Sequence, residues 1–278
     1  HASHLSVLPT VEIRAANIHE PRVLGELLKG MDAVVNLVGI LNERPGARFR
    51  DVHVELASKL VEEMRIARVP RLLHMSALGA DRSDAPSRYL RSKGEAEERV
   101  RGAAHIEVTV FRPSVIFGPG DSLTTRFVRL LRLARGWLPL ARPHARFAPV
   151  CVDDVAEAFM SALSDRATFA RTYELCGPEI LTLEQIVRAA ASAAAAPCRI
   201  VPLPDLLARL EGLVLGLVPG KPFSLDNFRS LTIDSVCREN GFAQLGIEPQ
   251  RLAAVLPAYL GTLAVPARFD RFRSSTDR

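Results

Sequence analysis

The sequence predicts an α/β protein with a doubly wound parallel sheet and a smaller, mainly helical C-terminal lobe. Three observations predict this fold. Short apolar runs alternate with longer segments of helical periodicity, and the runs are apolar throughout, as in strands buried on both faces. Residues 202–260 then show mostly helical patterns. We expect a larger α/β domain over residues 1–178, a smaller lobe over 179–264 that is interleaved with it, and a polar tail over 265–278.

The N-terminal part contains strand and helix patterns in strict alternation. The run "AVVNLVGI" (33–40) predicts a buried strand, and residues 54–69 have apolar side chains at helical spacing. A second strand is expected over 71–77, followed by a helix that starts near Ser87. Residues 106–121 predict a β-branched strand that ends in a Gly/Pro loop, with a helix over about 122–135.

The later segments continue the alternation. "VDDVAEAFMSAL" predicts a helix capped by Asp153, and "TYELCGP" a strand. In the next helix, Thr182 and Gln185 have the spacing of a capping box. The stretch 206–220 is the most apolar helical pattern, but it is too short to span a bilayer. It favours an ordinary buried helix of the lobe, and docking to a membrane or a protein is the alternative.

Composition excludes some classes of function. The net charge of +5 comes from arginines spread along the chain, without a basic stripe interleaved with aromatic residues, so no nucleic-acid partner is expected. Mild attraction to anionic ligands or lipid surfaces stays open. The four cysteines form no CxxC pair and the histidines show no ligand spacing, so we expect no metal and no disulfide framework. Free buried thiols in a reducing compartment are predicted.

The stretch "SRYLRSKGEAE" carries the clearest chemical pattern. On a helix, Tyr89 and Lys93 would share one face, about 5–6 Å apart at Cβ. Such a pair is either surface decoration or a proton donor whose pKa a neighbouring cation lowers. Ser76 ends a predicted strand thirteen positions before Tyr89, which makes the pattern more specific.

Several motifs together resemble the extended or atypical branch of the short-chain dehydrogenase/reductase superfamily. They are "NLVG", "HMSALGA", "YLRSK", "FRPSVIFGPGD" and "FAPVCVDDVAEAF", and the similarity runs from about Thr10 to about Pro178. Within that branch, the chain is similar to bacterial relatives of the NADPH-containing accessory subunit of respiratory complex I. These are often described as NAD-dependent epimerase/dehydratases or nucleoside-diphosphate-sugar epimerases. The resemblance implies a Rossmann-like fold and an NADP or NAD cofactor, with NADPH favoured.

The resemblance also implies roles for individual residues. Tyr89 would be the general acid/base, Lys93 would lower its pKa and bind the nicotinamide ribose, and Ser76 would hold the substrate oxygen. The cofactor contacts it implies are Asn17, Ile18, Asn36, Leu37, Val38, Gly39, Tyr89, Lys93, Arg112, Pro113, Ser114 and Val115. Alternatively, Asn36 and Gly39 form only a tight strand exit, and Pro113 and Ser114 only a strand-terminating turn.

One element of the family pattern is missing from the sequence. The family begins with a strand, a glycine-rich turn and a helix, where the pyrophosphate meets backbone N–H groups. The early glycines, Gly25, Gly30, Gly39 and Gly46, do not form that motif. Without the first strand, the strand at 33–40 would keep an unpaired edge. We therefore expect omitted residues or a late gene start, or else a strand borrowed from a partner.

Two functions follow from these observations. One is an active NAD(P)-dependent oxidoreductase or sugar-nucleotide epimerase/dehydratase that uses Ser76, Tyr89 and Lys93. The other is a nucleotide-binding subunit with weak or no turnover, in which the same residues hold a permanent cofactor. The second is favoured, with a membrane-associated protein complex as its partner. Its expected location is the cytoplasm, either free or peripheral at the inner face of a membrane.

Overall fold

A parallel sheet of four strands forms the centre of the larger domain. The computed structural model describes residues 5, 7–80, 84–216 and 223–261. The strands are β1 (Ala33–Asn36), β2 (Arg71–Met75), β3 (Glu107–Pro113) and β8 (Thr172–Leu175), in the spatial order β1-β2-β3-β8. All three pairings are parallel. The predicted α/β class is confirmed.

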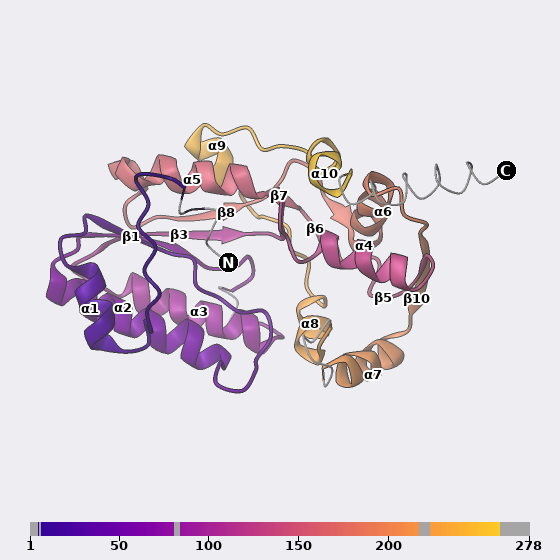
Figure 1. Cartoon of the computed structure of the whole chain (residues 1–278), viewed down its shortest axis with the longest axis horizontal. Helices are drawn as coiled ribbons and strands as arrows, with labels where there is room; N and C mark the ends of the chain where they lie inside the picture. The colour runs from indigo at the N-terminus through magenta and orange to yellow at the C-terminus, as the bar shows by residue number, and fades with distance from the viewer. Residues whose placement is uncertain (1–4, 6, 81–83, 217–222, 262–278) are drawn as a thin grey trace.

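Helices cover both faces of this sheet, as Figure 1 shows. Three helices lie on one face: α1 (Pro21–Leu28), α2 (Leu56–Ala67) and α3 (Arg88–Arg101). α5 (Val152–Ser164) and the short α9 (Gly241–Leu245) lie on the other. Successive side chains of a strand point to opposite faces. Leu72 therefore packs with the core residues under α1 and α2, and Leu73 packs with those under α5. The sheet is therefore doubly wound, as predicted.

The smaller lobe is mainly helical, which confirms that prediction. Its helices are α4 (Thr124–Leu133), α6 (Leu183–Ala193), α7 (Asp205–Leu215), α8 (Leu225–Ser230) and α10 (Leu252–Leu260). α6 has the predicted capping box of Thr182 and Gln185. A parallel pair, β5 (Trp137–Ala141) with β10 (Arg199–Leu203), was not predicted. Each of these strands contains a proline, which is tolerated because both are edge strands.

Several short elements lie between the longer helices and strands. They are a π-helix at Arg50–Glu55, a 3₁₀ turn at Arg166–Thr168, and the short strands β4 (Ile116–Phe117), β6 (Arg146–Phe147), β7 (Val150–Cys151) and β9 (Leu181–Thr182). β5 and β10 come from opposite sides of residue 178, which is compatible with the predicted interleaving of the two parts. The exact boundary at residue 178 stays a prediction.

The strand β1 lies at one edge of the sheet. Among the described residues it pairs only with β2, as expected for the strand at 33–40. Val35 within it is 46% exposed although it is a large apolar side chain. No helix in the described ranges is both long and apolar enough to cross a membrane. The tail over 265–278 lies outside the described residues.

Two predictions about local chemistry were wrong. The helix α5 begins after Cys151, so Asp153 lies in its first turn and is not its cap. Cys176 and Cys237 form a disulfide, although free thiols were expected. The two cysteines are 61 positions apart. Asn240, three residues after Cys237, donates a hydrogen bond to the Cys176 carbonyl just after β8 and so holds the two segments together. Cys151 and Cys198 are free, as predicted.

Candidate functional site

Most of the predicted catalytic and cofactor-binding residues lie at the carboxyl ends of the parallel strands. Asn36 ends β1, Ser76 follows β2 and Pro113 ends β3. Tyr89 and Lys93 come from the helix α3, whose N-cap Ser87 accepts a hydrogen bond from the Leu90 N–H. This edge of an open α/β sheet is where ligands usually bind.

Lys93 is buried and points toward the turn after β1. Its side chain is buried (5% exposed), and its Nζ donates to the Met75 carbonyl at 3.0 Å. A Cβ atom at Gly39 would lie 3.1 Å from that Nζ, so a residue without a side chain suits this position. Burial lowers the pKa of Lys93 to about 8. The Lys93 ammonium lies beside the turn at Gly39, where no side chain blocks it, and is therefore a suitable hydrogen-bond donor for a polar ligand.

Tyr89 is half-buried, and its ring is enclosed by other rings. Phe49 and His53 meet it edge-on, with centroids 6.0 and 5.8 Å away, and Ile233 packs in the same cluster. Its hydroxyl has no hydrogen-bond partner among the described residues. Burial raises the pKa of Tyr89 to about 12. This differs from the sequence expectation, because the Lys93 ammonium is engaged with the Met75 carbonyl.

Two buried polar atoms lack partners beside this pair. Ser76 Oγ and His74 Nε2 form no hydrogen bond within the described part of the chain. Burial lowers the pKa of His74 to about 3, so the ring is neutral at pH 7. Its Nδ1 lies 3.2 Å from the Asn36 Nδ2 donor, which leaves the proton on Nε2. An unpaired buried donor costs about 1–3 kcal/mol, so the site favours a polar ligand.

The sequence analysis left His53 unassigned, but the structure places it between the turn after β1 and the helix α3. Its Nε2 accepts from the Ile40 N–H at 3.1 Å. Its Nδ1 therefore carries the proton and donates to Ser92 Oγ at 2.8 Å, and Ser92 donates onward to the Tyr89 carbonyl. Burial, and then the charge of Lys93, lower the pKa of His53 to about 3. A histidine in the otherwise apolar stretch "VHV" was the sequence signal.

The small lobe contributes Asp226, which was also missed. Its carboxylate accepts from the N–H groups of Arg88 and Tyr89 at 2.8 and 3.0 Å. These are N–H groups of the first turn of α3, where a carboxylate is favourable. Ser224, beside it, donates to Asn42 in the loop after the β1 turn. The lobe thus holds the start of the helix that carries Tyr89.

Three residues that were predicted to contact the cofactor form side-chain hydrogen bonds or ion pairs with other residues of the chain. Arg112 is buried and forms a two-pronged ion pair with Glu97 of α3, at 2.9 and 2.6 Å. Ser114 Oγ donates to the Ser235 carbonyl at 2.7 Å. Asn17 donates to Glu20 within its own turn. Their side chains are thus engaged within the chain, and their contacts with a cofactor stay predictions.

The remaining residues that were predicted to contact the cofactor lie either in the turn after β1 or at positions that pack or bond within the chain. Leu37 and Val38 lie in the turn after β1 and are exposed, with the Val38 N–H bound to the Asn36 side chain. Ile18 packs against the core on the α1 side of the sheet. The carbonyl of Val115 accepts from the Val150 N–H. Of the predicted contacts in the described turn, Gly39 is the one that lies beside Lys93.

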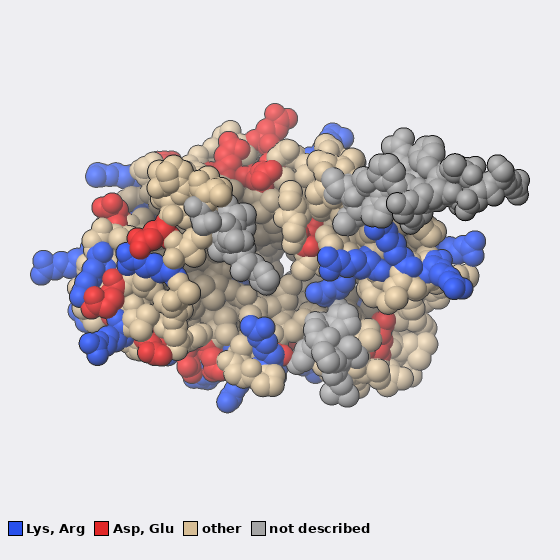
Figure 2. Space-filling view, in the orientation of Figure 1, with Lys and Arg blue, Asp and Glu red and all other residues tan. Residues whose placement is uncertain are grey.

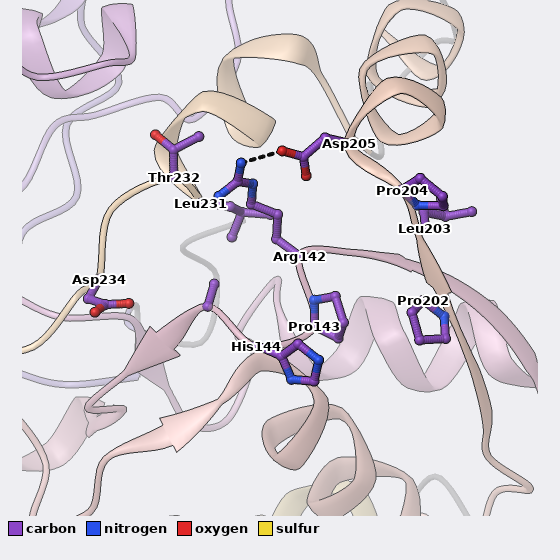
Figure 3. A pocket seen from close by; sticks show the side chains of 11 residues that line it. Arg142, Pro143, His144, Pro202, Leu203, Pro204, Asp205, Leu231, Thr232 and Asp234 are labelled. Atoms are coloured by element: carbon purple, nitrogen blue, oxygen red, sulfur yellow. Dashed lines mark hydrogen bonds and ion pairs between the residues drawn. The ribbon is translucent and has the colours of Figure 1, made fainter.

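A pocket of about 570 Å³ lies in the small lobe, separate from Tyr89 (Figure 3). Thr232 and Asp234 line it, while Ile233 between them packs toward Tyr89. Arg142 also lines the pocket, but its guanidinium is paired with Asp205. The other lining residues are Pro143, His144, Ala145, Pro202, Leu203, Pro204 and Leu231. The pocket therefore offers a paired arginine and three prolines.

Comparison with solved structures agrees with the observed fold. The chain superposes on UDP-glucuronic acid 4-epimerase from Bacillus cereus with a TM-score of 0.73 and 15% identity, covering 94% of this chain and 84% of that one. At this level of identity the likeness concerns the fold alone.

Sequence relatives are closer. The mitochondrial NADH dehydrogenase [ubiquinone] 1 alpha subcomplex subunit 9 of Arabidopsis thaliana is 31% identical over 80% of this chain and 58% of its own length. The ceramide reductase of Caulobacter vibrioides is 30% identical over 70% of this chain and 60% of its own length. The chain thus spans about three fifths of the length of these two relatives.

The sequence profile of a family described as NAD(P)H-binding matches residues 1–166, more than half of the chain. The strand-end position of the site, its buried lysine and its unpaired polar atoms agree with that match. The protein belongs to the NAD(P)H-binding atypical short-chain dehydrogenase/reductases.

Proposed function

We propose that the protein holds NADPH as a long-lived cofactor, with weak or no turnover, in the manner of a nucleotide-binding subunit. The supporting observation is the state of Tyr89. Its ring packs against Phe49 and His53, its hydroxyl has no partner among the described residues, and burial raises its pKa to about 12. A general acid works best with a pKa near the working pH. Tyr89 is better suited to holding a ligand than to exchanging protons at pH 7.

The residues present fit one half of a dinucleotide. Lys93, the turn at Gly39 and the unpaired Ser76 Oγ and His74 Nε2 offer donors for the hydroxyl groups and the amide of a nicotinamide riboside. When bound, the nicotinamide supplies hydride-transfer chemistry. The described residues contain no glycine-rich turn for the pyrophosphate. The described residues therefore fit the nicotinamide riboside half of the dinucleotide, and the proposal does not extend to how the pyrophosphate and adenosine would be held.

The partners and location are proposed from the relatives. The Arabidopsis relative is named as a subunit of NADH dehydrogenase, so we propose a membrane-associated protein complex as the partner of this chain. The corresponding location is the cytoplasmic side of a membrane, with the protein bound peripherally.

The second candidate is an active oxidoreductase, favoured by the relative named ceramide reductase. In it, Ser76 Oγ would donate to the carbonyl oxygen of a substrate, and Tyr89 would deliver the proton. Lys93 would have to move toward Tyr89 to lower its pKa. A sugar-nucleotide substrate is less favoured, because the arginine of the small-lobe pocket is already paired with Asp205.

The test uses the protein expressed from its complete reading frame. The purified protein is denatured and any released nucleotide is identified and quantified by mass spectrometry. We expect about one NADPH per chain, which long-chain and sugar carbonyls fail to oxidise. A nucleotide that a carbonyl oxidises, with the reaction lost in Tyr89→Phe, would instead establish the enzyme. No nucleotide at all would refute both functions.

A further inference from the structure

The helix α7 has its large apolar side chains on the outside. Leu206, Leu207, Leu210, Leu213 and Val214 are between 50% and 78% exposed. These positions recur at helical spacing and form one stripe. The residues turned inward are small: Ala208 is fully buried, and a Cβ atom at Gly212 would lie 3.0 Å from the Leu225 backbone nitrogen. This is the reverse of the usual surface helix.

The charged residues of α7 lie beside the stripe and have contacts within the chain, although Asp205 and Arg209 stay exposed. Asp205 is paired with Arg142, and the Arg209 guanidinium lies 5.7 Å from the centre of the Phe228 ring. Glu211 is half-buried, and burial raises its pKa. The outer stripe therefore has few charges of its own. An exposed apolar stripe of this kind indicates a binding surface.

The segment around β5, a strand that contacts α7, is rich in arginine, although Arg142 and Arg146 within it are paired with Asp205 and Asp234. Residues 122–152 contain six arginines and no aspartate or glutamate. Two of these, Arg129 and Arg135, are exposed on α4 and just after it. β5 follows directly and pairs with β10, the strand that leads into α7. Figure 2 shows blue side chains gathered over α4 and toward β10, above the position of α7 in Figure 1, with red side chains between them.

An exposed tryptophan lies in the same region. Trp137 starts β5 and is 52% exposed, and the Arg199 guanidinium lies 5.3 Å from its ring centre. Leu133 at the end of α4 is also exposed. Tryptophan and arginine are typical of segments at the boundary between lipid headgroups and acyl chains.

We propose that α7 and the arginine-rich α4–β5 segment form a docking face for a bilayer that contains anionic phospholipids. The leucine stripe would enter the headgroup boundary, and the arginines would face the negative lipid surface. A helix of 11 residues is suited to lying in that plane. A second copy of the chain fits less well, since a narrow stripe falls short of the roughly 800 Å² per partner of a standard interface. Two arginine-rich faces would also repel each other.

The docking face rests on the proposed peripheral location at a membrane, but it does not depend on nucleotide binding, so the docking face and the NADPH proposal can fail separately. The test measures co-sedimentation of the full chain with vesicles of phosphatidylcholine alone or with about a third phosphatidylglycerol. We expect binding to the anionic vesicles that weakens with added salt, because counterions screen the arginines. Nucleotide content is measured on the same samples, and it should not change with vesicle binding.

Variants then separate the two contributions. Leu210→Ser with Leu213→Ser should weaken the partition coefficient by about tenfold or more per leucine. Arg129→Gln with Arg135→Gln should weaken binding to anionic vesicles by about fivefold per arginine, and leave phosphatidylcholine unaffected. Ile66→Ser with Met160→Ser is the matched control, because these side chains are 60% and 69% exposed on the other domain. The control should bind like the unsubstituted chain.

Three results would overturn the proposal. One is no binding of the full chain to anionic vesicles at low salt. Another is equal binding by the leucine variant and the control. The third is a dimer in analytical ultracentrifugation that only the leucine variant loses, because the stripe would then bind a second copy. The exposed position of the leucines makes unfolding of these variants unexpected, and a thermal melt checks it.

Discussion

The helices α3 and α7 depart from the usual amphipathic pattern in opposite ways. α3 buries polar side chains, among them Lys93 and Glu97, against the sheet. α7 exposes its leucines and turns Ala208 and Gly212 toward the protein. Both arrangements cost folding free energy, because the first dehydrates charges and the second leaves apolar surface in water. Under the two proposals above, a nucleotide beside α3 and a membrane surface against α7 would offset part of these costs.

The two helices differ in how strongly the rest of the fold depends on them. The polar groups of α3 are tied to the sheet, to the turn after β1 and to the small lobe through Arg112, His53 and Asp226. The outer stripe of α7 has no such ties among the described residues. Substitutions on α3 should therefore change stability, whereas substitutions on the outer face of α7 should leave it unchanged.

The largest effect is expected at the buried ion pair of α3. Glu97→Gln removes the charge that faces the Arg112 guanidinium and should lower the free energy of unfolding by about 3–5 kcal/mol. Chemical denaturation measures this loss. Glu98→Gln, one position along and exposed, is the control and should stay within about 0.5 kcal/mol. Equal stability of the two variants would show that α3 is not anchored by this pair.

A smaller effect should appear in the pH dependence of stability through Lys93. Burial lowers its pKa from 10.5 to about 8. Below pH 8 the ammonium is charged in both states, and folding has to dehydrate it. Between pH 8 and 10.5 the unfolded chain binds more protons, so this contribution raises the free energy of unfolding as pH rises.

Lys93→Met removes that titration. The unfolding free energy of Lys93→Met minus that of the unsubstituted protein should therefore fall by about 2 kcal/mol between pH 7.5 and pH 9.5, because only the unsubstituted protein gains stability over this range. Urea denaturation at both pH values measures it, below the range where Tyr89 titrates. Lys29→Met controls for the loss of one positive charge at an exposed ion pair. A pH-independent difference would mean that Lys93 is not dehydrated.

His53 should show an effect of about 1–3 kcal/mol. His53→Leu leaves the Ile40 N–H without an acceptor, at about that cost, and removes the donor to Ser92 Oγ, which still donates to the Tyr89 carbonyl; the turn is thereby loosened from α3. We expect a lower melting temperature and less NADPH retained on purification. His53→Gln keeps an acceptor for the Ile40 N–H and should recover part of both losses. Leucine and glutamine variants that both behave like the unsubstituted protein would exclude this bridging role.

The sequence predicted α3 well because its signals are local. The N-cap Ser87, the spacing of Tyr89 and Lys93 and the strand end at Ser76 are all set by neighbouring residues. His53 and Asp226 could not be assigned, because their partners are 39 and 137 positions away. The same holds for the disulfide, which depends on where the segment before α9 returns to β8.

For α7, the sequence predicted the helix but not which face is covered. Its leucines have the spacing of an ordinary buried stripe, and that interpretation was favoured. Only the position of α8 shows that the side with Ala208 and Gly212 faces inward, since Gly212 approaches the Leu225 backbone. Burial is a property of the neighbouring elements, and helical periodicity alone does not determine it.

The smallest effect is expected on the outer face of α7, where Leu210→Gln should change the free energy of unfolding by less than about 0.5 kcal/mol. Its inward neighbour gives the contrast. Gly212→Ala gains helix propensity, but its Cβ would lie 3.0–3.2 Å from three backbone atoms of Ser224 and Leu225, which cannot yield as a side chain can. We expect a net loss of about 1 kcal/mol, measured by denaturation. A Leu210→Gln variant less stable than Gly212→Ala would mean that the leucine side is the covered one, and the contrast with α3 would disappear.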